Sequence, residues 1–418
     1  MLKNITGTFF TRLVVSVLNF VIIILTAKLM GAEVRGSISL CMLAIAIAGL
    51  VNEIVGGPAI VYLIPRYENK HIAKLSYLWA VVVSISCSLI LALLHFYEIQ
   101  FLLMVSLCSL LLCTGSIHQF ILLGHQKIKA FNYIALSQGI VMFLVFIGFL
   151  LAEKNQIQSY FYSLLTAYAV SFILGLLLTR FIWNIKESLN VKPNLKILFN
   201  NGILTQLASL THLMSSRVSF YFSGHFFSLA FVGVLSTAVS ITEAAMLFST
   251  SVALITASTV SNETDKRKAS ETTLKLIKLS LLISFATLLV LSIFPEKMMS
   301  EIFGKDFKGI KIIILSLIPG ALANSISQVI SHYYSGLGRF KINTTVGFIS
   351  LSVSVLGGLL FFKTGTVLLP GVIISMSSTI AMIYFVRLFL YENELKIQHL
   401  IPGIPDIKLL FEKLKQKS

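Results

Sequence analysis

Twelve apolar stretches, each about as long as a lipid bilayer is thick, fill this chain and constrain its fold more than any other feature. Hydrophobic residues make up 56% of the 418 residues and charged residues only 12%, so no sizeable water-soluble domain fits between the stretches. A helix needs roughly 20 residues to cross a hydrocarbon core about 30 Å thick, and in lipid its backbone groups must pair internally. The sequence therefore predicts an all-α polytopic membrane protein.

The connections between the predicted spans differ in charge on the two sides of the membrane. Of the 33 Lys and Arg residues, 24 fall on the side of the N-terminus, 8 on the opposite side, and Arg217 within a span. Because cytoplasmic loops are enriched in Lys and Arg, we expect both termini in the cytoplasm. This placement accounts for the net charge of +16 without a nucleic-acid partner. The predicted spans are residues 8–30, 38–63, 75–95, 100–123, 130–151, 161–183, 199–222, 232–257, 274–294, 310–334, 342–362 and 368–390.

Similar turns follow the fourth and the tenth spans. They read LLGHQKIKAFNYI and GLGRFKINTTVGF, which aligns Gly124 with Gly338 and Lys127 with Lys341. Six spans separate the turns, so the repeat is parallel, a plan in which transporters place the substrate site between two halves. We expect two six-helix lobes around a central cleft, residues 1–195 and 196–391, followed by a basic cytoplasmic tail at 392–418.

The seventh predicted span carries a stripe of polar side chains. They recur every three or four residues, which places them on one helix face: Thr205, Ser209, His212, Ser216, Ser219 and Ser223. Arg217 lies beside the stripe and Gln206 on its flank. Ser and Thr alone can pair with their own helix, but Arg and His are costly in lipid. The stripe predicts the wall of a hydrated cavity, with substrate-binding candidates Gln206, Ser209, His212, Ser216 and Arg217.

Shorter polar faces occur in other spans. The first span carries Arg12 and Asn19, and the tenth carries Asn324 and Gln328, just after a Pro319-Gly320 pair that should kink the helix. These four residues are further candidates for substrate binding, although Arg12 lies close enough to the cytoplasmic surface to snorkel there.

Two acidic residues, Glu53 and Glu243, lie near the middle of the second and eighth spans. Each could be a protonated packing residue, the partner of Arg217 or Arg12, or the ligand of a coupling cation. We take both as candidates for ion coupling. A Gly57-Pro58 pair close to Glu53 predicts a break in its helix.

Motifs of catalysis and of metal binding are absent from the sequence. It contains no HExxH, GxSxG or P-loop, and its four cysteines lie in apolar segments without metal-ligand spacing. We therefore expect no catalytic residue, metal site or cofactor, and only a proton or a sodium ion as a coupling ion.

Several diffuse motifs spread over nearly the whole chain: LMGAEVRGSISL, GGPAIVYLIPRY, FVGVLSTAVSITEA, EIFGKDFKGI and GLGRFK. With them the chain resembles the O-antigen (Wzx-type) flippases of the multidrug/oligosaccharidyl-lipid/polysaccharide transporter superfamily. The resemblance implies two lobes around a cationic cleft in the bacterial inner membrane. It implies a substrate of undecaprenyl-pyrophosphate-linked oligosaccharide, for O-antigen, capsule or a related surface polysaccharide, flipped by cation-coupled alternating access. It also implies polysaccharide polymerase and chain-length machinery as partners.

Two other functions remain as alternatives. A multidrug antiporter for organic cations shares this architecture, but it would need an acidic, aromatic-lined cavity, whereas the deepest charge in the stripe is Arg217. A membrane enzyme such as a polysaccharide polymerase would need a long outer loop for its chemistry, and the longest predicted outer connection, about residues 295–309, is short.

Overall fold

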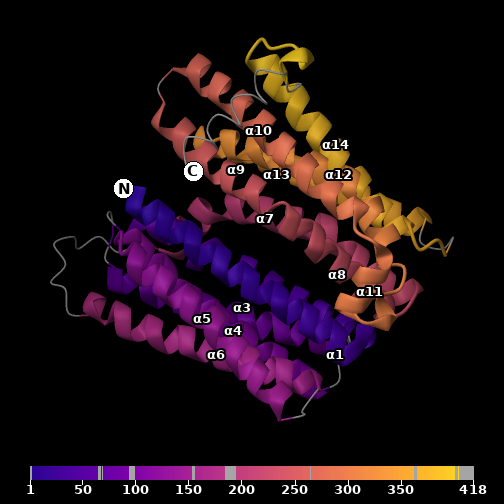
Figure 1. Cartoon of the computed structure of the whole chain (residues 1–418). Helices are drawn as coiled ribbons and strands as arrows, with labels where there is room; N and C mark the ends of the chain where they lie inside the picture. Colours follow the sequence, from indigo (N-terminus) through magenta and orange to yellow (C-terminus); the bar gives the residue numbers. More distant parts are fainter. Residues whose placement is uncertain are drawn as a thin grey trace. The chain divides into compact units, whose positions relative to one another are not determined.

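The computed structural model describes residues 2–64, 67, 69–93, 99–152, 156–183, 194–263, 265–361, 365–400 and 403. These residues form helices and their connections (Figure 1). The chain divides into two compact units, unit 1 (Met1–Leu210) and unit 2 (Thr211–Ser418). The boundary predicted at 195/196 coincides with the start of α7 (Leu195–Phe226), whereas the division between the units falls inside this helix.

Unit 1 is a helical bundle in which α4 packs against all the other long helices before α7. Its core is apolar and includes Ile45, Cys108 and Phe161, each almost inaccessible to solvent. The elements of unit 1 that precede α7 are α1 (Leu2–Gly56), α2 (Pro58–Leu63), α3 (Asn69–Leu93), α4 (Ile99–Gly124), α5 (Ile128–Leu151), α6 (Ile157–Thr179) and the 3-10 helix η1 (Arg180–Trp183).

The long helix α1 contains two spans joined at Gly31. The apolar stretch Phe10–Val61, which runs from α1 into α2, has 52 residues, about 78 Å of helix against a hydrocarbon core of about 30 Å. At Gly31 the backbone leaves helical geometry, with φ 84° and ψ 171°, a region essentially confined to glycine. A second break occurs at Gly57, and Pro58 then occupies the first turn of α2, as the sequence predicts.

Unit 2 is built around α12, which packs against α8, α9, α10, α13 and α14. The elements that follow α7 are α8 (Leu229–Ala245), α9 (Leu247–Asn262), α10 (Lys266–Ile293), α11 (Glu296–Phe303), η2 (Lys305–Phe307), α12 (Ile310–Gly336), α13 (Phe340–Phe361), α14 (Leu369–Glu392) and η4 (Ile397–Leu400). Helices α8 and α9 meet at a bend of 53°. The hydroxyl of Thr287 on α10 donates to the carbonyl of Ala245 at this bend, 3.1 Å away.

The lengths and composition of the helices identify a multi-pass membrane protein. Among the described residues, nine helices are long and apolar enough to span a bilayer, and the bent pair α8–α9 makes a tenth candidate. Taking α1 as two spans and adding α7 gives twelve, in agreement with the predicted fold. Helix α7 has 32 residues, which is long enough to span a bilayer. Its polar side chains, rather than its length, explain why it is not counted among the sufficiently apolar helices.

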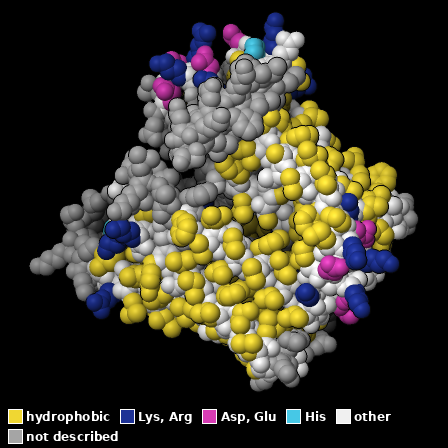
Figure 2. All heavy atoms as spheres, viewed as in Figure 1, with side chains coloured by type: hydrophobic (Ala, Val, Ile, Leu, Met, Phe, Trp, Pro, Cys, Tyr) yellow, Lys and Arg dark blue, Asp and Glu magenta, His cyan; other side chains and the backbone are white. Residues whose placement is uncertain are grey.

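Exposed side chains on the long helices are mostly apolar. Figure 2 shows such side chains covering much of the described surface on one face of the molecule. On α3, Ile85 and Leu89 are 62% and 58% exposed, and on α10 Val290 and Ile293 are 64% and 70% exposed. Because large exposed apolar patches are rare on water-soluble proteins, these surfaces face lipid.

Helix α12 runs through Pro319 as one element, and α14 supplies a polar group beside the proline. The Ser375 hydroxyl donates to the Ser316 carbonyl at 2.6 Å and accepts from the Gly320 amide at 3.1 Å. The two helices lie close together here, since a Cβ atom on Gly320 would come within 2.5 Å of the Ser375 Cα. A hydroxyl from a neighbouring helix thus bridges Ser316 and Gly320, the residues on either side of the proline's turn.

The two turns that the sequence pairs have the same backbone conformation, but in a different register from the sequence alignment. After α4, the Lys127 amide donates to the Leu122 carbonyl at 2.8 Å and Gln126 has φ 57°. After α12, the Arg339 amide donates to the Tyr334 carbonyl at 2.9 Å and Gly338 has φ 72°. Both are Schellman-type helix ends.

Corresponding positions in these two turns differ by 212 residues, not by the 214 of the sequence alignment. Gly338 therefore corresponds to Gln126 rather than to Gly124, and Arg339 corresponds to Lys127.

In each unit, the basic residue of this turn contacts the C-terminal end of another helix. In unit 1 this is η1, which continues α6, and in unit 2 it is the end of α14. The Lys127 ammonium lies 3.2 Å from the ring centroid of Phe181 in η1. Arg339 forms a two-pronged ion pair with Glu392 at 2.6 and 2.8 Å. This hydrogen bonding with Glu392 raises the pKa of the Arg339 guanidinium. Residues 401, 402 and 404–418, most of the predicted basic tail, lie outside the described residues.

Candidate functional site

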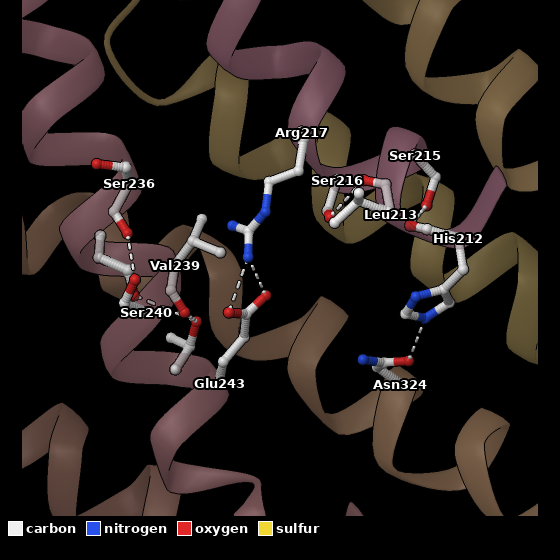
Figure 3. Close-up of polar contacts among 12 residues, drawn as sticks. His212, Leu213, Ser215, Ser216, Arg217, Ser236, Val239, Ser240, Glu243 and Asn324 are labelled. Atoms are coloured by element: carbon white, nitrogen blue, oxygen red, sulfur yellow. Dashed lines mark hydrogen bonds and ion pairs between the residues drawn. The ribbon is translucent and has the colours of Figure 1, made fainter. Parts of the chain in front are cut away.

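An ion pair between Arg217 on α7 and Glu243 on α8 is the central feature of the candidate site (Figure 3). The Arg217 Nη2 donates to both oxygens of the Glu243 carboxylate, at 2.8 and 2.9 Å. The Arg217 side chain is 18% exposed and that of Glu243 is 52% exposed. We call these two residues the charge pair. One guanidinium nitrogen makes both bonds, so the other nitrogen donors remain available to a ligand.

Glu243 occupies an electrostatically unfavourable place in its helix. It lies in the last turn of α8, where Met246 donates its amide hydrogen back to the Glu243 carbonyl at 3.0 Å. The C-terminus of a helix carries a partial negative charge, which disfavours a carboxylate. Arg217 offsets this repulsion, and the Arg217 guanidinium is itself held over the Phe220 ring at 5.0 Å.

A second polar contact joins α7 to α12. The His212 Nε2 lies 3.4 Å from the Asn324 Oδ1. His212 is exposed, and Asn324 is half-buried at the middle of α12. Figure 3 shows the two side chains pointing toward one another from their separate helices, in the same region as the charge pair. We call this contact the first amide pair.

A third polar contact joins α9 to α12. The Thr250 hydroxyl donates to the Gln328 Oε1 at 3.1 Å, and Thr250 is exposed. Gln328 follows Asn324 by four residues, so both amide side chains share one face of α12. We call this contact the second amide pair. The charge pair and the two amide pairs together form the polar face of unit 2.

The predicted stripe on α7 is only partly exposed. Ser209 is exposed and Ser216 half-buried, and each donates to a carbonyl of its own helix. Ser219 and Ser223 are fully buried, and their hydroxyls have no hydrogen-bond partner among the described residues. Packing against α13 explains the burial at this end, since Ser354 donates to the Ser215 carbonyl. The exposed polar part of the stripe is therefore restricted to its middle.

The remaining candidates belong to unit 1. Arg12 and Asn19 are both exposed on α1 and lie two helical turns apart. Gln206 is only 3% exposed and hydrogen-bonds the carboxyl group of Glu53. This contact lies beside the break at Gly57. The structure thus brings Glu53 together with Gln206, and Glu243 together with Arg217.

Two contributors to the polar face are not evident from polar spacing alone. Phe220 contacts Arg217 from one turn further along α7, and an aromatic residue three positions after an arginine could have indicated this contact. The His332 Nδ1 donates to the Gln328 backbone carbonyl, 2.8 Å away. Its position four residues after Gln328 places it on the same face of α12.

The location of these polar side chains indicates contact with water. Asn324 lies at the centre of α12, a helix that qualifies as a membrane span. A charged side chain facing lipid at mid-membrane costs about 2.5–3.5 kcal/mol on insertion scales. The charge pair and both amide pairs nevertheless contain exposed members. Several exposed polar groups on neighbouring helices need hydrogen-bond partners, which water supplies. We therefore infer that this surface is hydrated.

Comparison with known proteins connects this geometry to a transporter fold. The MatE family model matches residues 205–360, a segment that contains the whole polar face of unit 2. No curated protein matches the chain.

Three solved structures illustrate the likeness over the whole chain. An inward-facing multidrug-resistance MATE-family transporter of the MOP superfamily has a TM-score of 0.72 at 14% identity, covering 92% of this chain and 98% of its own. The lipid II flippase MurJ in an inward closed conformation has a TM-score of 0.69 at 16% identity, covering 96% and 89%. A MOP-superfamily transporter from Pyrococcus furiosus has a TM-score of 0.66 at 13% identity, covering 94% of each chain. At such low identity the likeness establishes a MATE-like fold.

Proposed function

We propose that this protein is a flippase for lipid-linked oligosaccharide. Its substrate would be an oligosaccharide joined through pyrophosphate to undecaprenol, moved from the cytoplasmic to the outer leaflet of the bacterial inner membrane. The observation that carries the proposal is the exposed polar face of unit 2, in which an arginine and neutral hydrogen-bonding groups occur together on membrane-spanning helices. The MATE-like fold supports the proposal, because the flippase MurJ has the same fold.

The energetics of the reaction explain why such a face is needed. Moving one unpaired hydroxyl from water into hydrocarbon costs roughly 4–8 kcal/mol, so several sugars face a barrier of tens of kcal/mol. The amide pairs offer donors and acceptors that replace water for the sugars, while the polyprenyl chain stays in lipid. Arg217 can bind the pyrophosphate through charge-assisted hydrogen bonds.

The charge pair suggests how an ion gradient drives the cycle. A pyrophosphate that binds Arg217 competes with Glu243 for the same guanidinium group. A proton or a sodium ion that binds Glu243 would take over the role of Arg217 in neutralising the carboxylate at the end of α8. Each cation that enters down the membrane potential supplies about 2.3 kcal/mol per 100 mV. This energy sets the direction of transport, and the polar face lowers the barrier for the sugars.

Export of organic cations is the second candidate function, and one observation favours it. The Glu243 side chain is 52% exposed and could attract a cation. In this structure, however, Arg217 occupies both of its oxygens. A cationic drug would have to displace an arginine, whereas an anionic lipid headgroup would be attracted by it.

Reconstitution of the full chain into proteoliposomes distinguishes the two functions. We expect movement of lipid-linked oligosaccharide between leaflets and no counterflow of a cationic dye. Arg217→Ala should abolish the movement, while Arg267→Ala should have no effect, because Arg267 is exposed and its one ion pair among the described residues is with Glu271 on its own helix. Dye counterflow without movement of the lipid would overturn the proposal. Unchanged movement in the Arg217 variant would remove Arg217 from the mechanism.

The same proposal fixes the cellular setting. The substrate is assembled on the cytoplasmic leaflet of the inner membrane, and the distribution of Lys and Arg predicts that both termini lie on this side. We infer that polysaccharide polymerase and chain-length machinery use the flipped product at the outer leaflet.

A further inference from the structure

We propose that the polar face of unit 2 binds its substrate in one fixed direction, with separate positions for the pyrophosphate and for successive sugars. This inference rests on the proposed flippase function and specifies its substrate-binding site. The charge pair binds the pyrophosphate, the first amide pair binds the sugar next to it, and the second amide pair binds a sugar further along the chain.

The order of the three positions follows from the helices that carry them. On α7, Arg217 and His212 are five residues apart, about 7.5 Å along the axis. On α12, Asn324 and Gln328 are four residues apart, about 6 Å along the axis. Helices α7 and α12 are the seventh and tenth of twelve alternating spans, so they run in opposite directions. Moving from Asn324 to Gln328 therefore leads away from Arg217.

The hydrogen-bonding capacity of each amide pair suits a sugar hydroxyl. The carbonyl oxygens of Asn324 and Gln328 are engaged by His212 and Thr250. Neither amide nitrogen has a hydrogen-bond partner among the described residues, and neither is among the buried atoms without partners. Each NH₂ group thus offers two donors. Because the amides carry no charge, they favour a neutral glycan over a phosphate.

Packing alone does not account for these side chains. Polar residues often join membrane helices, and such residues are normally enclosed between the helices that they join. His212 and Thr250 are instead exposed. In contrast, Ser327 on the buried side of α12 donates only to the Ala323 carbonyl of its own helix. Helix α12 therefore carries a half-buried polar face, which holds Asn324 and Gln328, and a separate packing face.

Binding of three lipids of increasing glycan length tests the inference. The purified full chain in nanodiscs is titrated with polyprenyl pyrophosphate, with its one-sugar form and with a form that carries at least three sugars. Arg217→Ala should weaken binding of all three lipids by about 10- to 100-fold, as expected for charged hydrogen bonds. Asn324→Ala should weaken only the two forms with sugars, by about fivefold.

Variants of the second amide pair provide the most specific result. Gln328→Ala should weaken only the lipid with at least three sugars, by about fivefold, and the isosteric Thr250→Val should show the same selectivity. Ser327→Ala should bind all three lipids like the unaltered protein and serves as the control on the same helix.

Equal losses for all three lipids in the Gln328 and Thr250 variants would overturn the inference, as would unchanged binding of every lipid. Either result leaves the flippase proposal intact if Arg217→Ala still weakens binding. If the unaltered protein binds none of the three lipids, the proposed function itself fails.

Discussion

Replacing Ser375 by alanine should destabilise unit 2, because this hydroxyl serves two backbone groups of another helix. It donates to the Ser316 carbonyl at 2.6 Å and accepts from the Gly320 amide at 3.1 Å, next to Pro319, which has no amide hydrogen. The residue is 6% exposed, so water does not readily take its place. The substitution removes a single oxygen atom and leaves the apolar packing in place.

The expected loss of stability follows from these two contacts. An unpaired buried backbone group costs about 1–3 kcal/mol, while hydrogen bonds between membrane helices average about 0.6 kcal/mol in double-mutant cycles. With two groups affected, we expect the free energy of unfolding to fall by about 1–4 kcal/mol. Chemical unfolding of the purified protein in detergent micelles measures this difference.

Thr379→Val is the matched control for Ser375→Ala. In the part of the chain that the structure describes, the Thr379 hydroxyl donates to the Ser375 carbonyl alone, within α14 itself. Its removal therefore leaves no group on α12 without a partner, and we expect little change in stability. If the two variants unfold at the same denaturant concentration, the hydroxyl of Ser375 does not support α12 and the reasoning is refuted.

Two further predictions concern the ion pairs. Glu243→Gln should preserve folding but reduce the response of lipid movement to an imposed proton or sodium gradient in proteoliposomes, because an amide does not bind an exchangeable cation. A full response would exclude Glu243 from ion coupling. Arg339→Glu should destabilise the protein by about 1 kcal/mol, a modest value because the pair is partly exposed, and adding Glu392→Arg should restore thermal stability. A double variant no more stable than the single one would show that the pair contributes nothing to stability.

The spans could be predicted from the sequence because they depend on local pattern. Apolar length alone predicts the membrane helices, and an arginine beside a polar stripe predicts a side chain that faces a hydrated cavity. Glu243 could be recognised as a candidate partner for Arg217, but the pairing itself depends on how α7 and α8 pack. The same applies to Gln206, which spacing places at the edge of the stripe and which the structure buries against Glu53.

The register in which the two turns correspond could not be predicted, because glycine has a different role in each turn. Gly338 adopts a positive φ. Gly124 instead allows close packing, since a Cβ atom there would lie 2.5 Å from the Ile64 Cδ1. In unit 1 the positive φ falls on Gln126, which carries no sequence signature of such a turn. Aligning the two glycines therefore shifts the repeat by two residues.

The break at Gly31 has a consequence for how the protein is made. Two apolar segments follow one another with a single residue between them outside helical geometry. The connection between them is short, because helix follows helix across Gly31, and its charged residues are Glu33 and Arg35. We therefore expect the first two spans to enter the bilayer together, as one hairpin.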